Sequence, residues 1–150
     1  MGFWRGKLRP LLVEQLRRGT SPEKLAQTLA VGISVSTCPI FGSTTFLAGA
    51  VGAALGLNHA LLQIVNYAAM PLQILLILPY CRLGRAVFAP TSAALPDLAT
   101  LAQMSPVSAL GAGGVALLRG TAAWAVTAPA CAWLLYQALL PVVRKLKKKK

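Results

Sequence analysis

The charges of this chain gather at its two ends, and this distribution constrains the fold more than any other feature of the sequence. Of the 15 lysine and arginine residues, six lie between Arg5 and Lys24 and six between Arg144 and Lys150. The long middle holds the remaining three, which are Arg82, Arg85 and Arg119. A soluble nucleic-acid-binding protein with a net charge of +12 would carry its charge along one groove or helix face. Basic ends and an apolar middle are typical of a membrane protein.

The proportion of charged residues favours the same class. Charged residues make up 12% of the chain and hydrophobic residues 56%, whereas an average soluble domain is about 25% charged. So few charges leave too little polar surface to coat a soluble protein of 150 residues. We therefore expect a single all-α integral membrane domain over residues 1–150, with no nucleic-acid partner.

The first half of the chain predicts a helical hairpin. Residues 1–19 form a basic amphipathic segment, either a helix on anionic lipid or a solvated lead-in. Two apolar runs follow within 21–57, and each is shorter than the roughly 20 residues that a spanning helix needs. Cys38-Pro39-Ile40-Phe41-Gly42 separates the runs. We expect a re-entrant hairpin, whose turn must be buried in protein or line a wet cavity.

Small residues recur every four positions in both arms of the hairpin. Residues at this spacing share one helix face, and small side chains let helices approach closely in lipid. The two stripes are Ala26, Ala30, Ser34 and Cys38, and Thr44, Ala48, Gly52 and Gly56. The stripes favour close packing of the hairpin arms over compositional chance.

Two segments are long enough to span a bilayer, 59–80 and 121–140. Residues 89–119 form a connection with a short apolar segment and a short interfacial helix, and 141–150 form a polybasic tail. We expect Trp124, Trp133 and Tyr136 to anchor the second span at the interface, and Pro129 to kink it. A short segment before a full span in each half hints at an inverted repeat.

Catalysis and metal binding have little support. The acids Glu14, Glu23 and Asp97 lie outside the predicted spans, and the histidine, His59, lies at the boundary of the first span. Hydrolysis needs a base beside a nucleophile, or a metal with several ligands. Three separated cysteines without a CxxC pair predict packing residues rather than disulfides or a metal site. We expect no enzyme activity, cofactor or metal.

Several short motifs resemble a bacterial membrane family known as domain of unknown function 2062. They lie between Gly19 and about Phe88: Ser21-Pro22-Glu23-Lys24-Leu25-Ala26, Cys38-Pro39-Ile40-Phe41-Gly42, Leu57-Asn58, Asn66-Tyr67, Pro71-Leu72-Gln73 and Arg82-Leu83-Gly84. The chain is similar to the branch in which Asn-Tyr precedes Pro-Leu-Gln, and residues 89–150 match less well. The resemblance implies a multi-pass inner-membrane protein with a family-like core over 20–88, and it supplies no activity.

The polar residues around the predicted turn form the candidate site, for a substrate or for structure. They are Pro39, Gly42, Ser43, Thr44, Thr45, Asn66 and Gln73. As a substrate site, the N-terminus of the second hairpin helix would bind an anionic head group. As a structural site, Ser43 and Thr44 cap the helix, while Asn66 and Gln73 satisfy backbone groups freed at Pro39 and Pro71. We expect Asn66 to brace the Pro39–Gly42 turn.

Two functions remain open at this point. The protein could transport or flip an anionic lipid-linked substrate. Alternatively, it could be a non-catalytic scaffold or partner subunit, because two full spans enclose little volume alone. Both readings are compatible with anionic lipids at the basic ends and with a homo-oligomer or a membrane-protein partner. Since both ends are basic, both termini are expected in the cytoplasm.

Overall fold

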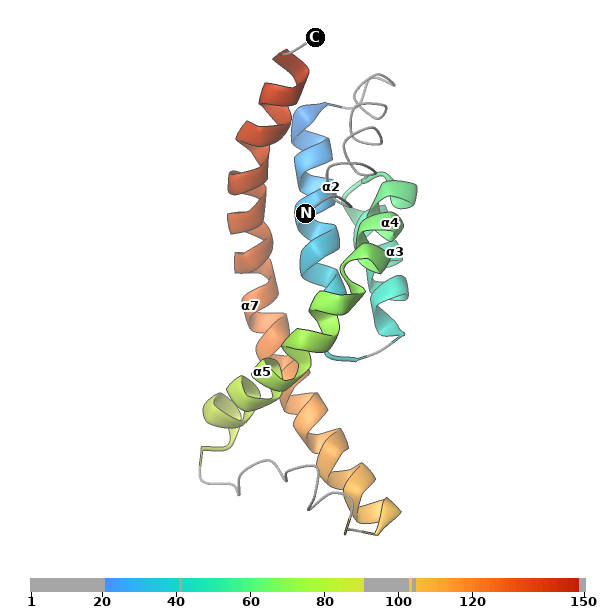
Figure 1. The fold of residues 1–150 in the computed structure, drawn as a ribbon, viewed down its shortest axis with the longest axis vertical. Helices are drawn as coiled ribbons and strands as arrows, with labels where there is room; N and C mark the ends of the chain where they lie inside the picture. Colours follow the sequence, from blue (N-terminus) through green and yellow to red (C-terminus); the bar gives the residue numbers. More distant parts are fainter. Residues whose placement is uncertain (1–20, 41, 91–102, 104, 149–150) are drawn as a thin grey trace.

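The computed structural model describes residues 21–40, 42–90, 103 and 105–148, and within them the chain forms five helices and no strand (Figure 1). The helices are α2 (Pro22–Ser36), α3 (Ser43–Ala54), α4 (His59–Ala68), α5 (Met70–Phe88) and α7 (Pro106–Lys148). The expectation of an all-helical chain is confirmed. Segment 1–19, most of the connection between α5 and α7 with its predicted interfacial helix, and the last two lysines lie outside the described residues.

Helix α2 begins where the local sequence predicts it. The Ser21 side chain accepts a hydrogen bond of 3.2 Å from the backbone N–H of Lys24, and Pro22 occupies the first turn. A serine cap followed by proline suits a helix start, because proline lacks an N–H that would be unpaired there anyway. The helix ends at Ser36, and the Thr37 hydroxyl donates back to the Ser34 carbonyl at 2.7 Å.

Helix α3 lies between two glycines with left-handed backbone conformations. Gly42 (φ 81°) precedes it and Gly56 (φ 59°) follows it. At the far end the N–H of Leu57 donates to the Gly52 carbonyl at 2.8 Å, and the N–H of Gly56 donates to the Ala53 carbonyl at 3.2 Å. This pair of bonds is a Schellman motif, which ends a helix at a residue that tolerates positive φ. Gly56 is exposed and ends the helix, so it does not extend the predicted packing stripe.

The remaining small residues of both stripes do pack. In α2, Ala26, Ala30 and Ser34 are buried, and in α3 the buried residues are Thr44, Ala48 and Gly52. A Cβ atom added at Gly52 would lie 2.7 Å from the Leu62 side chain of α4, and one at Gly32 would lie 2.9 Å from Val65. Helix α4 therefore fits closely against both arms of the hairpin.

The predicted span 59–80 is divided in the structure. Helix α4 ends at Ala68, Ala69 is the junction, and α5 runs on to Phe88, past the predicted end at Tyr80. Pro71 causes the break, because it lacks an N–H and its ring opposes the carbonyl four residues earlier, at Tyr67. The chain thus changes direction between α4 and α5 (Figure 1).

Helix α7 also differs from the expectation. It is one helix of 43 residues, in place of a short segment ending near Leu118 and a separate span over 121–140. It continues through Gly111, Gly113 and Gly114, and no atom of the described residues lies within 4 Å of a Cβ added at any of these. The proposed repeat of a short segment and a span in each half is therefore not present.

Two hydrophobic clusters hold the helices together. One joins α2, α4 and the C-terminal part of α7 through residues that include Leu25, Leu61, Val65 and Val143. The other joins α2, α3 and α4 through Val35, Ala48, Leu57 and Leu62. Helix α5 lies outside both clusters and crosses α7, whose N-terminal part continues beyond the crossing (Figure 1).

Two stretches are long and apolar enough to cross a membrane, Met70–Phe88 and Gly111–Leu146. Most of their residues are not buried within the protein, and large apolar side chains such as Leu75 (71% exposed) and Val126 (72%) face outward. An outward apolar face of this extent is unusual in a soluble monomer.

Candidate functional site

The turn between α2 and α3 is the centre of the predicted site, and it is buried. Cys38 is 1% exposed and Pro39 is likewise among the most completely buried residues, whereas Ile40 is 38% exposed at the apex. The N–H of Cys38 donates to the Val35 carbonyl at 3.2 Å. Gly42 supplies the left-handed conformation that lets the chain reverse, which an L side chain resists.

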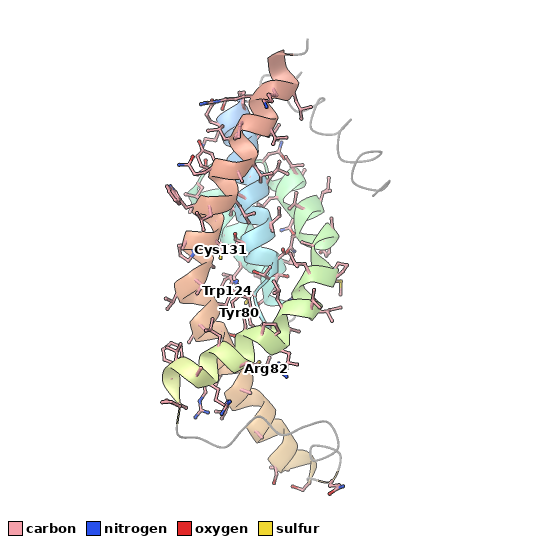
Figure 2. All side chains as sticks on the ribbon, turned by 60° about the vertical axis from the view of Figure 1, so that its left-hand side comes forward. Tyr80, Arg82, Trp124 and Cys131 are labelled. Carbon is pink, nitrogen blue, oxygen red and sulfur yellow. The ribbon has the colours of Figure 1, made fainter. Side chains whose placement is uncertain are left out.

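Side chains from α5 and α7 hold this turn. Gln73 is 4% exposed, and its Nε2 donates to the Cys38 carbonyl at 2.8 Å. Trp124 of α7 is 8% exposed, and its indole Nε1 donates to the Ser34 carbonyl at 3.1 Å and to Thr37 Oγ1 at 3.2 Å. Carbonyls freed at the end of α2 thus have partners inside the protein. Figure 2 shows Trp124 about halfway along the molecule.

The polar residues at the start of α3 serve the turn as well. The Ser43 hydroxyl donates to the Ile40 carbonyl at 2.8 Å and lies 3.7 Å from the Cys38 sulfur. Thr44 is 7% exposed. The Thr45 carbonyl accepts a bond of 3.1 Å from Gln63 Nε2 of α4. The expectation that Ser43 and Thr44 cap α3 was wrong, because the N-cap is Gly42 and no side chain bonds to it, and the Ser43 hydroxyl bonds within the turn instead.

Asn66 does not brace the turn as expected. It is 4% exposed, and its Oδ1 has no hydrogen-bond partner among the described residues. The bond to the turn comes instead from Gln73, seven residues further along, because the junction at Ala69 directs α5 under the end of α2. The sequence identified both amides and assigned the bracing role to the wrong one.

Among the described residues, three buried polar atoms in the helices around the turn have no hydrogen-bond partner. They are Ser34 Oγ, Gln63 Oε1 and Asn66 Oδ1. Leaving a polar group unpaired in an apolar interior costs about 1–3 kcal/mol. Their hydrogen-bonding capacity remains available to a water molecule or to a polar ligand.

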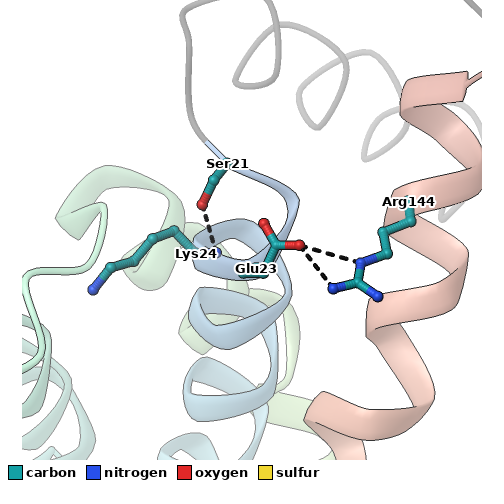
Figure 3. Close-up of polar contacts among 4 residues, drawn as sticks. All are labelled: Ser21, Glu23, Lys24 and Arg144. Carbon is teal, nitrogen blue, oxygen red and sulfur yellow. Dashed lines mark hydrogen bonds and ion pairs between the residues drawn. The ribbon is translucent and has the colours of Figure 1, made fainter.

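The sequence analysis did not identify the residues that join the start of α2 to α7 and to α3. Glu23 Oε1 accepts bonds from Arg144 Nη2 at 3.0 Å and Nε at 3.2 Å, which ties α2 to α7 (Figure 3). Lys24 extends the other way, and its Nζ donates to the Leu55 carbonyl at the C-terminus of α3 at 2.8 Å. A lysine suits that position because the helix dipole is negative there. The Ser-Pro-Glu-Lys motif therefore caps α2 and connects it to two other helices.

The prediction that Trp124 is an interfacial anchor was also wrong. Its position in an apolar helix predicts an interfacial anchor, but its side chain is buried against the hairpin, while Trp133 is 60% exposed. Among the cysteines, Cys38 and Cys81 are buried as expected of packing residues, and Cys131 is exposed. The small residue Ser34 in the stripe of α2 is a signal for a bulky neighbour, because the Trp124 indole bonds to its carbonyl.

Comparison with known proteins gives a match at the level of the family. No curated protein and no solved structure matches the chain. The sequence model of a family described as an uncharacterized protein conserved in bacteria matches residues 6–150. The match therefore extends through α7, beyond the segment up to Phe88 in which the resemblance was visible. The chain belongs to this family, the domain of unknown function 2062 (DUF2062).

Proposed function

We propose that this protein is a multi-pass integral protein of the bacterial inner membrane. The observation that carries the proposal is the outward apolar surface of α5 and α7, which includes Leu75, Val87, Val126 and Leu134, each more than half exposed. Lipid is the solvent that such a surface requires. Twelve of the 15 basic residues lie toward the two ends of the chain, where they can contact anionic head groups, and Arg82, Arg85 and Arg119 lie within the two apolar stretches.

The hairpin α2–α3 is re-entrant in this proposal. Helix α2 has 15 residues and α3 has 12, so each is at most about 22 Å long at 1.5 Å per residue. The hydrocarbon core is about 30 Å thick. Non-helical backbone is tolerated at membrane depth where protein covers it, and the bonds from Gln73 and Trp124 supply such cover.

We infer that the protein moves an anionic lipid-linked substrate across the membrane, without covalent chemistry or a cofactor. Support comes from the unpartnered atoms Ser34 Oγ, Gln63 Oε1 and Asn66 Oδ1. Polar groups inside a membrane protein are costly and tend to mark the path of a substrate. A head group passing beside the hairpin would find hydrogen-bonding capacity there.

The test is a flipping assay in proteoliposomes with a fluorescent phosphatidylglycerol. Wild-type protein should accelerate movement of the lipid between the leaflets. Asn66→Leu should slow this movement without loss of stability, because replacing an unpartnered polar group by an apolar one of similar shape is nearly neutral. Tyr67→Leu is the matched control, since Tyr67 is the next residue on α4 and is 62% exposed. Wild-type vesicles that flip no faster than empty ones would refute transport.

The alternative is a non-catalytic scaffold or partner subunit. It is favoured by the N-terminal part of α7, where Val107 and Leu118 are exposed and no described residue lies within 4 Å of a Cβ added at Gly111, Gly113 or Gly114. Glycines on an exposed helix allow another helix to approach closely. Mild-detergent purification distinguishes the two functions, because a stoichiometric protein partner without flipping activity would favour the scaffold.

A further inference from the structure

A groove between α2 and α7 lies outside the turn, and its lining includes Glu23 and Lys24, whose contacts with Arg144 and Leu55 are described above. Its volume is about 440 Å³, within the range of roughly 300–1,000 Å³ that is common for ligand pockets. Its polar part is formed by Glu23, Lys24 and Gln27 from the first turns of α2. Further along, its walls include Val31 of α2 and Ala132 and Trp133 of α7. The groove is thus polar near the start of α2 and apolar toward the middle of the molecule.

We infer that this groove binds one anionic phospholipid, with the phosphate at the Lys24 end and an acyl chain along Val31 and Ala132. The inference rests on the proposed membrane function and gives it a site and a substrate class. It replaces the head-group site expected at Ser43–Thr45, where the Ser43 hydroxyl and the Thr45 carbonyl already have partners.

The charges at the polar end select an anion. Glu23 is the carboxylate of the groove, and Arg144 is bonded to it at 3.0 Å. The Lys24 ammonium group extends away from α7 to the Leu55 carbonyl (Figure 3), so the cations that face a phosphate from the other wall are those of α7. Lys145 follows on α7 and is exposed. Arg144 and Lys145 of α7 against the one carboxylate of Glu23 leave this end positive, as recognition of a phosphate requires.

The apolar part of the groove suits a lipid tail better than a soluble anion. A free phosphate would gain nothing from Val31, Ala132 or Trp133, whereas an acyl chain gains from each apolar contact. Trp133 is 60% exposed beside the groove, and an aromatic side chain that is partly apolar and partly polar favours the membrane interface. A groove with one charged end and one apolar end therefore matches an amphiphile.

The test is native mass spectrometry of the full-length protein from micelles with equal phosphatidylglycerol and phosphatidylcholine. Wild-type protein should retain phosphatidylglycerol in preference. Ala132→Phe fills the groove and should lower retention by about tenfold or more. Trp133→Ala removes apolar surface without adding volume and should act in the same direction, so the result does not depend on one overpacked variant. Val126→Phe lies on the exposed face of α7 outside the groove lining and should retain lipid as the wild type does.

A second pair of variants tests the head group. Lys145→Gln should reduce the preference for phosphatidylglycerol, and Arg82→Gln, an exposed arginine toward the other end of the molecule (Figure 2), should not. Equal retention of both lipids by the wild type, unchanged retention by Ala132→Phe and Trp133→Ala, or a lipid-free dimer occupying the groove would each overturn the inference. Retention of phosphatidylglycerol without flipping would refute transport but not lipid binding in the groove. The two proposals can therefore fail separately.

Discussion

Gln73 and Asn66 show how two amides of one apolar segment differ in role. Both are 4% exposed, but Gln73 donates to the Cys38 carbonyl while Asn66 Oδ1 lacks a partner. Asparagine and glutamine have the same donors and acceptors. What separates them is the junction at Ala69, which gives α4 and α5 different directions. The donors and acceptors of a side chain follow from the sequence. Its hydrogen-bond partner depends on the direction of the helix that carries it.

We predict that Gln73→Met destabilises the protein by about 1–3 kcal/mol, because the Cys38 carbonyl would be buried without its donor. Methionine has a similar length, so the change removes the hydrogen bond with little change in volume. The measurement is thermal unfolding in mild detergent. Gln137→Met on the exposed face of α7 is the control and should unfold as the wild type does. Equal stability of the two variants would show that the turn does not depend on Gln73.

At the level of elements, α5 and α7 cross with their backbones almost in contact. A Cβ atom added at Gly84 would overlap the Arg119 carbonyl and lie 2.7 Å from the Gly120 nitrogen. One added at Gly120 would lie 3.1 Å from the Cys81 nitrogen. Backbone cannot move aside as a flexible side chain can, so the crossing needs glycine on both helices. Gly84 belongs to the Arg-Leu-Gly motif by which the sequence resembles its family.

Gly84→Ala should therefore separate the two helices and destabilise the protein by about 1–3 kcal/mol or more, the cost of an overpacked contact. Gly113→Ala is the matched control, because Gly113 lies in α7 with open space around it. An alanine there should be neutral or raise stability by up to about 1 kcal/mol through helix propensity. Unfolding in detergent compares the two variants, and the prediction fails if both behave alike.

The elements that were predictable are those defined by local chemistry. Ser21-Pro22 and Gly42 mark the start of α2 and α3 because capping and positive φ act within a few residues. The ends of the longer helices were not predictable in the same way. A glycine such as Gly120 reads as a helix breaker in the sequence, yet contact with α5 keeps it inside α7. The ion pair of Glu23 and Arg144 joins residues 121 positions apart, so no local sequence pattern predicts it.

On the scale of the whole molecule, the start of α2 and the end of α7 are held at the same end. The ion pair of Glu23 and Arg144 is about half exposed, and such a pair contributes at most about 1 kcal/mol. Val143 beside it is 1% exposed against Leu25 and Leu61, and full burial of a valine contributes about 1.5–3 kcal/mol. Apolar packing therefore holds the two ends together, and the ion pair aligns them.

This arrangement predicts a topology in which the start of α2 and the end of α7 lie on one side of the membrane and the C-terminal end of α5 lies toward the other (Figure 1). The basic clusters flanking α2 and ending α7 favour the cytoplasm. A periplasmic reporter fused after Pro90 should be active, and the same reporter after Lys150 should be inactive.

Ile40→Cys at the turn apex, in a Cys131→Ser background that removes the exposed native thiol, tests the hairpin. A re-entrant turn covered by Gln73 and Trp124 should not react with a membrane-impermeant thiol reagent added from the periplasm. Labelling of Ile40→Cys from the periplasm would show two complete crossings by α2 and α3, and reporters with matching activity would overturn the topology.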